Sequence, residues 1–120
     1  MNAPEKILME FLECWKKENF KRMVNFVQIT WKSDHVERGN EPKEILKNLY
    51  GHKKLIYFEI KDRKLTQGVF VDINVVIKYK TPDGIFTKKI IPRIICEIEA
   101  YQPSKEGTWG VNPIGVLKES

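Results

Sequence analysis

The sequence has few of the residues from which metal centres and disulfide scaffolds are built. It contains two cysteines and two histidines in 120 residues, and their spacing matches no zinc or redox motif. Cys14 and Cys96 each lie within an apolar pattern, which is typical of buried free thiols, so a disulfide between them is the less favoured alternative. We therefore predict no metal and no cofactor.

Long apolar runs are also missing. No run approaches the roughly 20 residues that a membrane-spanning helix requires, and the first residues lack the basic start and apolar centre of a signal peptide. We therefore expect a cytoplasmic protein with no membrane partner. Walker loops, dinucleotide fingerprints and nucleophile elbows are absent as well, so the sequence carries no signature of the common nucleotide-dependent enzymes and hydrolases.

What is present is the composition of one globular domain. Hydrophobic residues make up 42% and charged residues 31%, and 120 residues are too few for two independent cores. We expect a single domain over residues 1–120. The formal net charge of +5 permits weak contact with polyanions without requiring it, so nucleic acid is an unfavoured partner.

The clearest pattern is in Val69–Tyr79, where every odd position is apolar or aromatic. Side chains alternate between the two faces of a strand, so this pattern predicts a central strand with one continuous buried face. Phe70 and Val76 fall on the other face, and Ile95 joins them if the chain bulges near Pro92. An apolar patch on the outer face of a sheet is typical of a partner surface. We predict that these three residues form a dimer face.

Helical spacing precedes the strands along the chain. Apolar residues at helical intervals predict three helices, over residues 3–17, 20–31 and 42–50, with a polar loop over residues 33–41. Period-two patterns then predict four strands, over residues 54–66, 69–79, 85–101 and 108–117. Helices followed by hairpin-linked strands indicate an α+β domain, with three N-terminal helices packed on a mainly antiparallel four-stranded sheet.

The third predicted strand indicates that this sheet is strongly curved. A three-residue hairpin loop after Thr81 would place Ile85 and Ile91 on the buried face, whereas the apolar residues beyond Pro92 occupy even positions. A strand cannot change its buried face without an extra residue, and proline also lacks a donor for the ladder. We therefore predict a β-bulge or a sharp bend near Pro92.

This order of elements resembles the NTF2-like, cystatin-like superfamily, with an aromatic residue on each side of the helix break in Cys14–Phe20 and Trp109 in the final strand. The resemblance implies a cone, in which a curved antiparallel sheet wraps around the helices and leaves a cavity at its wide end. It also implies dimers through the convex sheet face. The superfamily includes ketosteroid isomerases, dehydratases, transport factors and non-catalytic modules, so the fold alone decides little about function.

The cavity of such a cone predicts a ligand pocket lined mostly by apolar side chains. We assign six residues to it, drawn from the helices and the strands: Trp15, Trp31, Tyr57, Val71, Ile73 and Trp109. A pocket of this character favours a small apolar ligand.

Acid–base chemistry has weaker support in the sequence. The isomerase branch needs a carboxylate base near a tyrosine, and Asp34, Asp72 and Tyr57 are loose candidates without the family's motif. Asp34 and His35 are adjacent on a predicted loop, which favours surface residues over a dehydratase pair. We therefore assign no catalytic residue.

Several charged clusters are interpreted as solvated faces. Glu97 and Glu99 share a strand face predicted to meet solvent, and lysines gather near the hairpin tip. A further cationic cluster covers the break between the first two helices, at Lys16, Lys17, Lys21 and Arg22, and an anion site there is the less favoured interpretation.

The leading functional hypothesis is a non-catalytic NTF2-like module, a homodimer that binds a protein partner or a small apolar ligand in the cone. The first alternative is a small acid–base enzyme of the isomerase or dehydratase type. The second alternative is a nucleic-acid-associated accessory protein, which a salt-steep affinity for DNA or RNA would favour.

Overall fold

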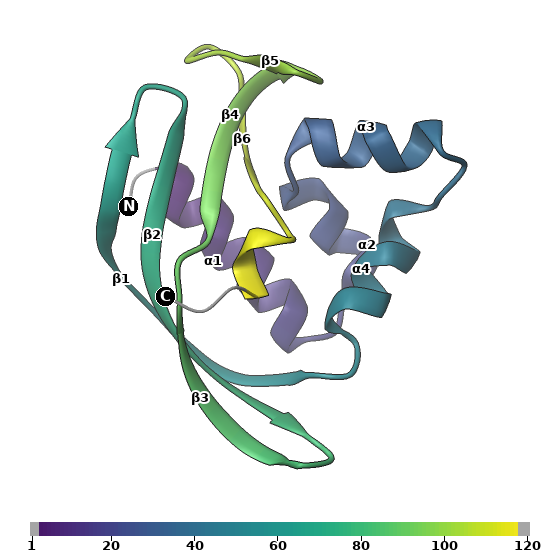
Figure 1. Ribbon diagram of the computed structural model, residues 1–120, viewed down its shortest axis with the longest axis vertical. Coiled ribbons are helices and arrows are strands. Elements are labelled where there is room, and N and C mark those ends of the chain that lie inside the picture. Colours follow the sequence, from purple (N-terminus) through teal and green to yellow (C-terminus); the bar gives the residue numbers. More distant parts are fainter. Residues whose placement is uncertain (1–2, 118–120) are drawn as a thin grey trace.

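The computed structural model describes residues 3–117, which form a layer of helices packed against a mainly antiparallel sheet that does not close (Figure 1). The helices are α1 (Ala3–Lys16), α2 (Phe20–Met23), α3 (Ile29–Glu37) and α4 (Pro42–Tyr50), with short 3-10 helices η1 (Val24–Phe26) and η2 (Gly115–Leu117). The strands are β1 (Lys54–Gln67), β2 (Phe70–Thr81), β3 (Gly84–Ile90), β4 (Arg93–Glu99), β5 (Gln102–Pro103) and β6 (Thr108–Val111).

The α+β class is confirmed, but the elements are more numerous than the sequence predicts. Residues 3–117 contain four α-helices and six strands, where three helices and four strands are predicted. The sheet runs in the order β1-β2-β4-β5, while β3 pairs with β2 and β6 pairs with β4. Figure 1 shows all the helices gathered on one side of this sheet.

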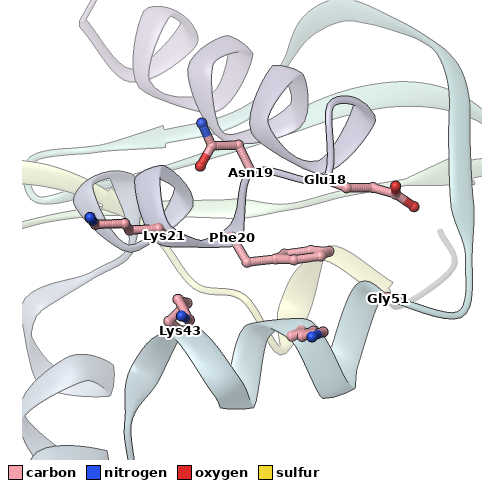
Figure 2. Close-up of a pocket in the computed structure, with 7 residues that line it drawn as sticks. Glu18, Asn19, Phe20, Lys21, Lys43 and Gly51 are labelled. Carbon is pink, nitrogen blue, oxygen red and sulfur yellow. The ribbon is translucent and has the colours of Figure 1, made fainter.

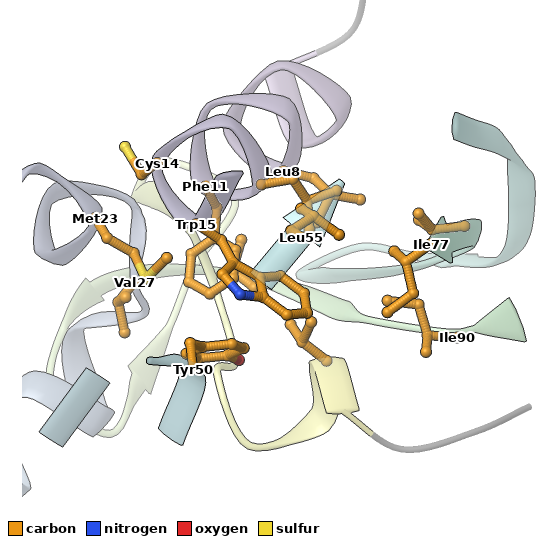
Figure 3. Packing of buried hydrophobic residues seen from close by; sticks show 14 of the residues in the cluster. Leu8, Phe11, Cys14, Trp15, Met23, Val27, Tyr50, Leu55, Ile77 and Ile90 are labelled. Atoms are coloured by element: carbon orange, nitrogen blue, oxygen red, sulfur yellow. The ribbon is translucent and has the colours of Figure 1, made fainter. Parts of the chain in front are cut away.

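Helix α1 supplies the centre of the core. Its residues Leu8, Phe11 and Trp15 lie on the predicted apolar stripe and are fully buried. The Trp15 indole Nε1 donates to the Lys53 carbonyl oxygen at 2.8 Å, and its ring meets Tyr50 of α4 edge-on, 4.9 Å between centroids (Figure 3). Burial of each such side chain contributes about 1.5–3 kcal/mol to stability. Because Trp15 contacts both Tyr50 and Lys53, it joins α1 to α4 and to the start of β1.

The second predicted helix is interrupted at Val27 and Gln28. Val27 is extended and bridges Val111 of β6, and the Gln28 N–H donates to the Val111 carbonyl oxygen at 3.0 Å. Gly110 permits this approach, because a Cβ there would lie 2.6 Å from the Gln28 backbone. Pairing with a distant strand therefore overrides the local helical pattern, and α3 begins as a separate helix that reaches Glu37. The loop predicted over residues 33–41 is thus wrong for residues 33–37 and correct for residues 38–41.

The last predicted strand is also too long. It ends at Val111, and the chain then turns through an Asx-type bond in which the Ile114 N–H donates to Asn112 Oδ1 at 3.1 Å. The Pro113 carbonyl oxygen accepts a hydrogen bond from the buried Tyr50 hydroxyl. This hydrogen bond joins the turn after β6 to α4. A longer strand would not make this contact.

Strand β1 carries the irregularities that the sequence assigns to Pro92. Its pairing with β2 shifts between Leu55 and Tyr57, between Ile60 and Arg63, and between Arg63 and Leu65, and each shift leaves an extra residue on β1. Extra residues on one strand bend it and increase its twist. The extra residues on β1 therefore favour the bend that is visible in the long strands of Figure 1.

Strands β3 and β4 continue one another in a single register along β2. Val75 lies opposite Ile90 and Val71 lies opposite Ile94, with the Pro92 carbonyl oxygen accepting from the Ile73 N–H between them. The predicted change of buried face at Pro92 is wrong, because the hairpin loop has two residues rather than three. The loop sets Thr81 opposite Gly84, which takes a φ of 138°.

The end of the β2–β3 hairpin projects beyond the helices (Figure 1). Tyr79 and Phe86 lie opposite each other there, with their rings 5.7 Å apart, while Ile85 is 57% exposed. The core cluster is formed by the odd face of β2, by buried residues of β1, β4 and β6, and by the helices, and Ile90 marks its limit along β3.

Candidate functional site

The six residues predicted to line a ligand pocket separate into three groups. Trp15 and Ile73 are fully buried within the core cluster, and Trp31 on α3 is buried at its margin. Tyr57 lies opposite Lys78 and is half-exposed, because the extra residue after Leu55 turns its side chain to the outer face of the sheet. The Tyr57 side chain therefore lies away from the core cluster that holds Trp15 and Ile73.

Val71 and Trp109 are the two members of that set that line a surface pocket. This sheet-end pocket has a volume of about 410 Å³ and is also lined by Pro4, Thr66, Arg63 and Lys105. Its apolar surface comes from β2, β6 and the start of α1, and its cations come from β1 and the loop before β6. The pocket can hold a ligand that combines an apolar body with a negative charge.

An ion pair fixes one wall of the sheet-end pocket. The Arg63 guanidinium donates two hydrogen bonds to the Glu5 carboxylate, at 2.8 and 2.9 Å, and both side chains are largely buried. The hydrogen bonds from Arg63 hold the pKa of Glu5 below its usual value. Because a bidentate pair is geometrically specific, it joins the start of α1 to β1 in one orientation.

The three residues predicted as a dimer face share the outer face of the sheet. Phe70 and Ile95 lie directly opposite each other across β2 and β4, and Val76 lies farther along β2, each of them half-buried. The Arg93 guanidinium stacks 4.0 Å from the Phe70 ring centroid and donates to Asp72 at 2.8 and 3.0 Å. The face therefore combines apolar side chains with a paired acid and base.

A second polar network lies where α3 meets β4, and we call Thr30, Asp34, Glu97 and Tyr101 the α3 corner. Glu97 is only 2% exposed, and its carboxylate accepts from both the Thr30 N–H (3.1 Å) and the Thr30 hydroxyl. The prediction of a solvated pair is thus wrong for Glu97. Its position at the first turn of α3 is favourable for a carboxylate, because the free N–H groups of that turn need acceptors.

The same corner accounts for the acid and histidine considered as a dehydratase pair. Asp34 and His35 lie on α3 rather than on a loop, and Asp34 accepts a hydrogen bond from the Tyr101 hydroxyl. His35 turns the other way, with its ring 4.5 Å from Trp31 and its Nδ1 3.3 Å from Asn40 Nδ2. Neighbours on a helix point about 100° apart, so these two side chains serve different contacts.

The sequence misses a pocket on the helical side of the molecule (Figure 2). It has a volume of about 460 Å³ and lies between the α1–α2 junction and α4, and we call it the basic pocket because Lys21, Lys43 and Lys47 line it. The cluster Lys16, Lys17, Lys21 and Arg22 was the available signal. Only Lys21 of that set lines the pocket, and its neighbours come from α4, more than twenty residues later.

Comparison with known proteins supports the fold and goes no further. The chain is similar to a SEC-C motif containing protein from Psychrobacter arcticus, with a TM-score of 0.64 and 14% sequence identity. The match covers 100% of this chain and 65% of that one, so the present chain spans less than two thirds of that protein's length. No protein-family model matches the sequence, and no curated protein matches it either.

Two further findings concern residues 3–117. No helix in that range has both the length and the apolar character needed to cross a bilayer. No three histidine, cysteine or acidic side chains come together there in a group that could hold a metal ion.

Proposed function

We propose that the chain is a non-catalytic binding module of the NTF2-like kind, which pairs with a second copy through the outer face of its sheet. A small ligand with an apolar body then occupies the sheet-end pocket. The observation that carries the proposal is the outer face itself, where Phe70 and Ile95 form an apolar pair beside the Arg93–Asp72 ion pair.

Support for a second copy as the occupant comes from the charges on this face. A two-fold interface places the same patch on both subunits, so the patch must complement itself. Asp72 and Arg93 lie opposite each other on β2 and β4 and carry opposite charges next to the apolar pair. A rotated copy can therefore place its Arg93 near Asp72 and its Phe70 against Ile95. A stable dimer needs about 1,200 Å² of total buried surface or more, so the interface must extend along β2 towards Val76.

The dimer is tested by light scattering coupled to size-exclusion chromatography at micromolar concentration. The native chain, of 14.1 kDa, is expected to elute with twice that mass. Ile95→Glu places a charge in the centre of the patch and should shift the mass to that of the monomer. Ile114→Glu is the matched control, because Ile114 is an exposed isoleucine on the turn after β6. A monomeric native chain, or equal dissociation by the control, would contradict the proposal.

The ligand in the sheet-end pocket has its own test, which uses the dye 8-anilinonaphthalene-1-sulfonate as the probe. The dye has an apolar ring system and one negative charge, which suits Trp109 and Val71 beside Lys105. Thr66→Trp fills the pocket from an exposed position and should weaken dye binding severalfold. Thr87→Trp makes the same change on an exposed residue of β3 and should leave it unchanged. Equal dye binding by the two variants would show that the pocket is not the site.

A further inference from the structure

The basic pocket is built by two parts of the helical layer that are far apart in the sequence. Asn19, Phe20 and Lys21 form one wall at the start of α2, and Lys43 and Lys47 form the other wall on α4. Figure 2 shows the Phe20 ring extending from the junction into the space between α2 and α4. The pocket thus has cations on both sides and an aromatic side chain at its base.

The charges around this pocket are poorly compensated. Within residues 3–117, neither Lys21 nor Lys47 forms an ion pair, and Lys43 meets only Glu44 of its own helix, at 3.7 Å. The one acidic residue of the lining, Glu18, lies 3.8 Å from Lys54 and so has a cation of its own. Like charges that face a common space repel one another unless an anion lies between them.

The walls of the pocket are held in place without a ligand. The Glu18 N–H donates to the Trp15 carbonyl oxygen at 3.0 Å, and the Asn19 N–H donates to the Cys14 carbonyl oxygen at 2.8 Å. This pair of bonds is a Schellman motif, which ends α1 and fixes the direction of the chain. The Asn19 side chain then caps α2 by accepting from the Arg22 N–H at 3.1 Å. Because this wall is already ordered, little conformational entropy is lost on binding.

We infer that the basic pocket binds a small molecule that carries a phosphate or diphosphate group, held between Lys21, Lys43 and Lys47. A lysine ammonium is a compact point charge, and three of them around one space match the spread charge of phosphate oxygens. A volume of about 460 Å³ is large enough for a ligand of nucleotide size. The site lies on the helical side, so it is independent of the dimer face and of the sheet-end pocket.

The experiment titrates the full chain with inorganic pyrophosphate at an ionic strength of about 0.1 M, where the Debye length is about 10 Å, and isothermal titration calorimetry measures the binding. We expect saturable binding with one site per chain. Lys21→Gln together with Lys47→Gln should weaken it by at least about tenfold, because charge-assisted hydrogen bonds are lost. Both lysines are exposed, so the variant should keep the native thermal unfolding temperature. A third change, Lys43→Gln, should weaken binding further.

The matched control is the double variant Lys64→Gln and Lys80→Gln, which removes the same charge from exposed positions on β1 and β2. Its affinity for pyrophosphate should change by less than about twofold, since charges beyond a Debye length are screened. Absence of saturable binding in the millimolar range would overturn the proposal, and so would an equal loss in both double variants. A single-stranded oligonucleotide that binds more tightly than pyrophosphate, with a steep salt dependence in native and variant chains alike, would replace it by a nucleic-acid surface.

Discussion

Two corners of the molecule hold a non-glycine residue in the left-handed region of the backbone: Glu18 at the α1–α2 junction, with φ of 57°, and Tyr101 at the α3 corner, with φ of 62°. At the α3 corner two hydrogen bonds offset the strain. The Tyr101 N–H donates to Thr30 Oγ1 at 2.8 Å, and its hydroxyl donates to Asp34. At the junction the Glu18 N–H donates to the Trp15 carbonyl oxygen at 3.0 Å, and the Glu18 side chain has only a half-exposed ion pair with Lys54, 3.8 Å long.

The difference indicates what each corner is for. A left-handed residue other than glycine costs about 1 kcal/mol, and glycine is the usual residue at this position after a helix. At Tyr101 the hydrogen bonds of the backbone N–H and of the side-chain hydroxyl offset that cost and join the turn after β4 to α3. The Glu18 side chain offsets little of it, and it lines the basic pocket. We therefore interpret the α3 corner as structural and the junction as a position shaped by binding, and three experiments test that division.

The largest expected effect is at Glu97. Glu97→Ala removes the acceptor of two bonds from Thr30 at the start of α3 and should lower the free energy of unfolding by about 2–3 kcal/mol. Glu97→Gln keeps one acceptor and should lose about half as much. Urea unfolding measures both variants. The control is Glu99→Ala on the same strand, an exposed position where we expect a change within about 0.5 kcal/mol. Equal losses at the two glutamates would remove the structural role of the corner.

The dependence of the free energy of unfolding on alkaline pH compares Tyr50 on α4 with Tyr101 at the α3 corner. Burial raises the pKa of Tyr50 on α4 far above its usual value, and the hydrogen bond to Asp34 raises the pKa of the exposed Tyr101. In both cases the folded state holds its proton more tightly, so the stabilisation is complete below the unfolded pKa, near 10, and is lost as the pH rises above it.

Tyr50 should dominate this loss, because its hydroxyl has no access to solvent. We expect it to contribute a fall in the free energy of unfolding of about 1.4 kcal/mol per pH unit above pH 10. Tyr50→Phe should therefore remove one proton's contribution from the slope of the free energy of unfolding against pH, whereas Tyr101→Phe should change that slope only slightly. Urea unfolding at about pH 9 to about pH 11, the range in which an unfolded tyrosine titrates, measures how the free energy of unfolding of each variant depends on pH. A larger change in the Tyr101→Phe variant would reverse the assignment.

The smallest expected effect bears most directly on the comparison. Glu18→Gly relieves the left-handed backbone and should raise the free energy of unfolding by about 0.5–1 kcal/mol. It should also strengthen pyrophosphate binding, because it removes a negative charge from the lining of the basic pocket. Tyr101→Gly relieves the same strain but loses the contact with Asp34, so it should not stabilise the chain. Thermal unfolding of both variants gives the answer, and stabilisation by both would erase the distinction between the corners.

The features that the sequence predicts correctly are those set by neighbours in the chain. The alternation in β2 buries Val71, Ile73, Val75 and Ile77, and the stripe of α1 buries its apolar residues as expected. The predicted helix over residues 20–31 is interrupted because Val27 pairs with the distant Val111 and because Thr30 donates to Glu97, 67 residues away. A contact of that range leaves no local periodicity. The turn of Tyr57 to the outer face depends on one extra residue in β1, which composition does not reveal.

The candidate sites divide in the same way. Phe70, Val76 and Ile95 are placed on one face by alternation along β2 and by its pairing with β4, so their shared position is predictable. The predicted bulge at Pro92 is not needed for this, since the register is continuous. The basic pocket depends on how α2 packs on α4, and the charges of Lys21 and Lys47 carry no information about that packing.

The projecting end of the β2–β3 hairpin is a suitable position for a label or an affinity tag. Its two ladders of backbone hydrogen bonds lack cover from the helices, so amide protons near Thr81 should exchange with deuterium well before those of Ile73. A fluorophore or an affinity tag inserted between Pro82 and Asp83 would sit at this fast-exchanging tip. From there it could report on assembly and ligand occupancy while the dimer face and both pockets keep their native side chains.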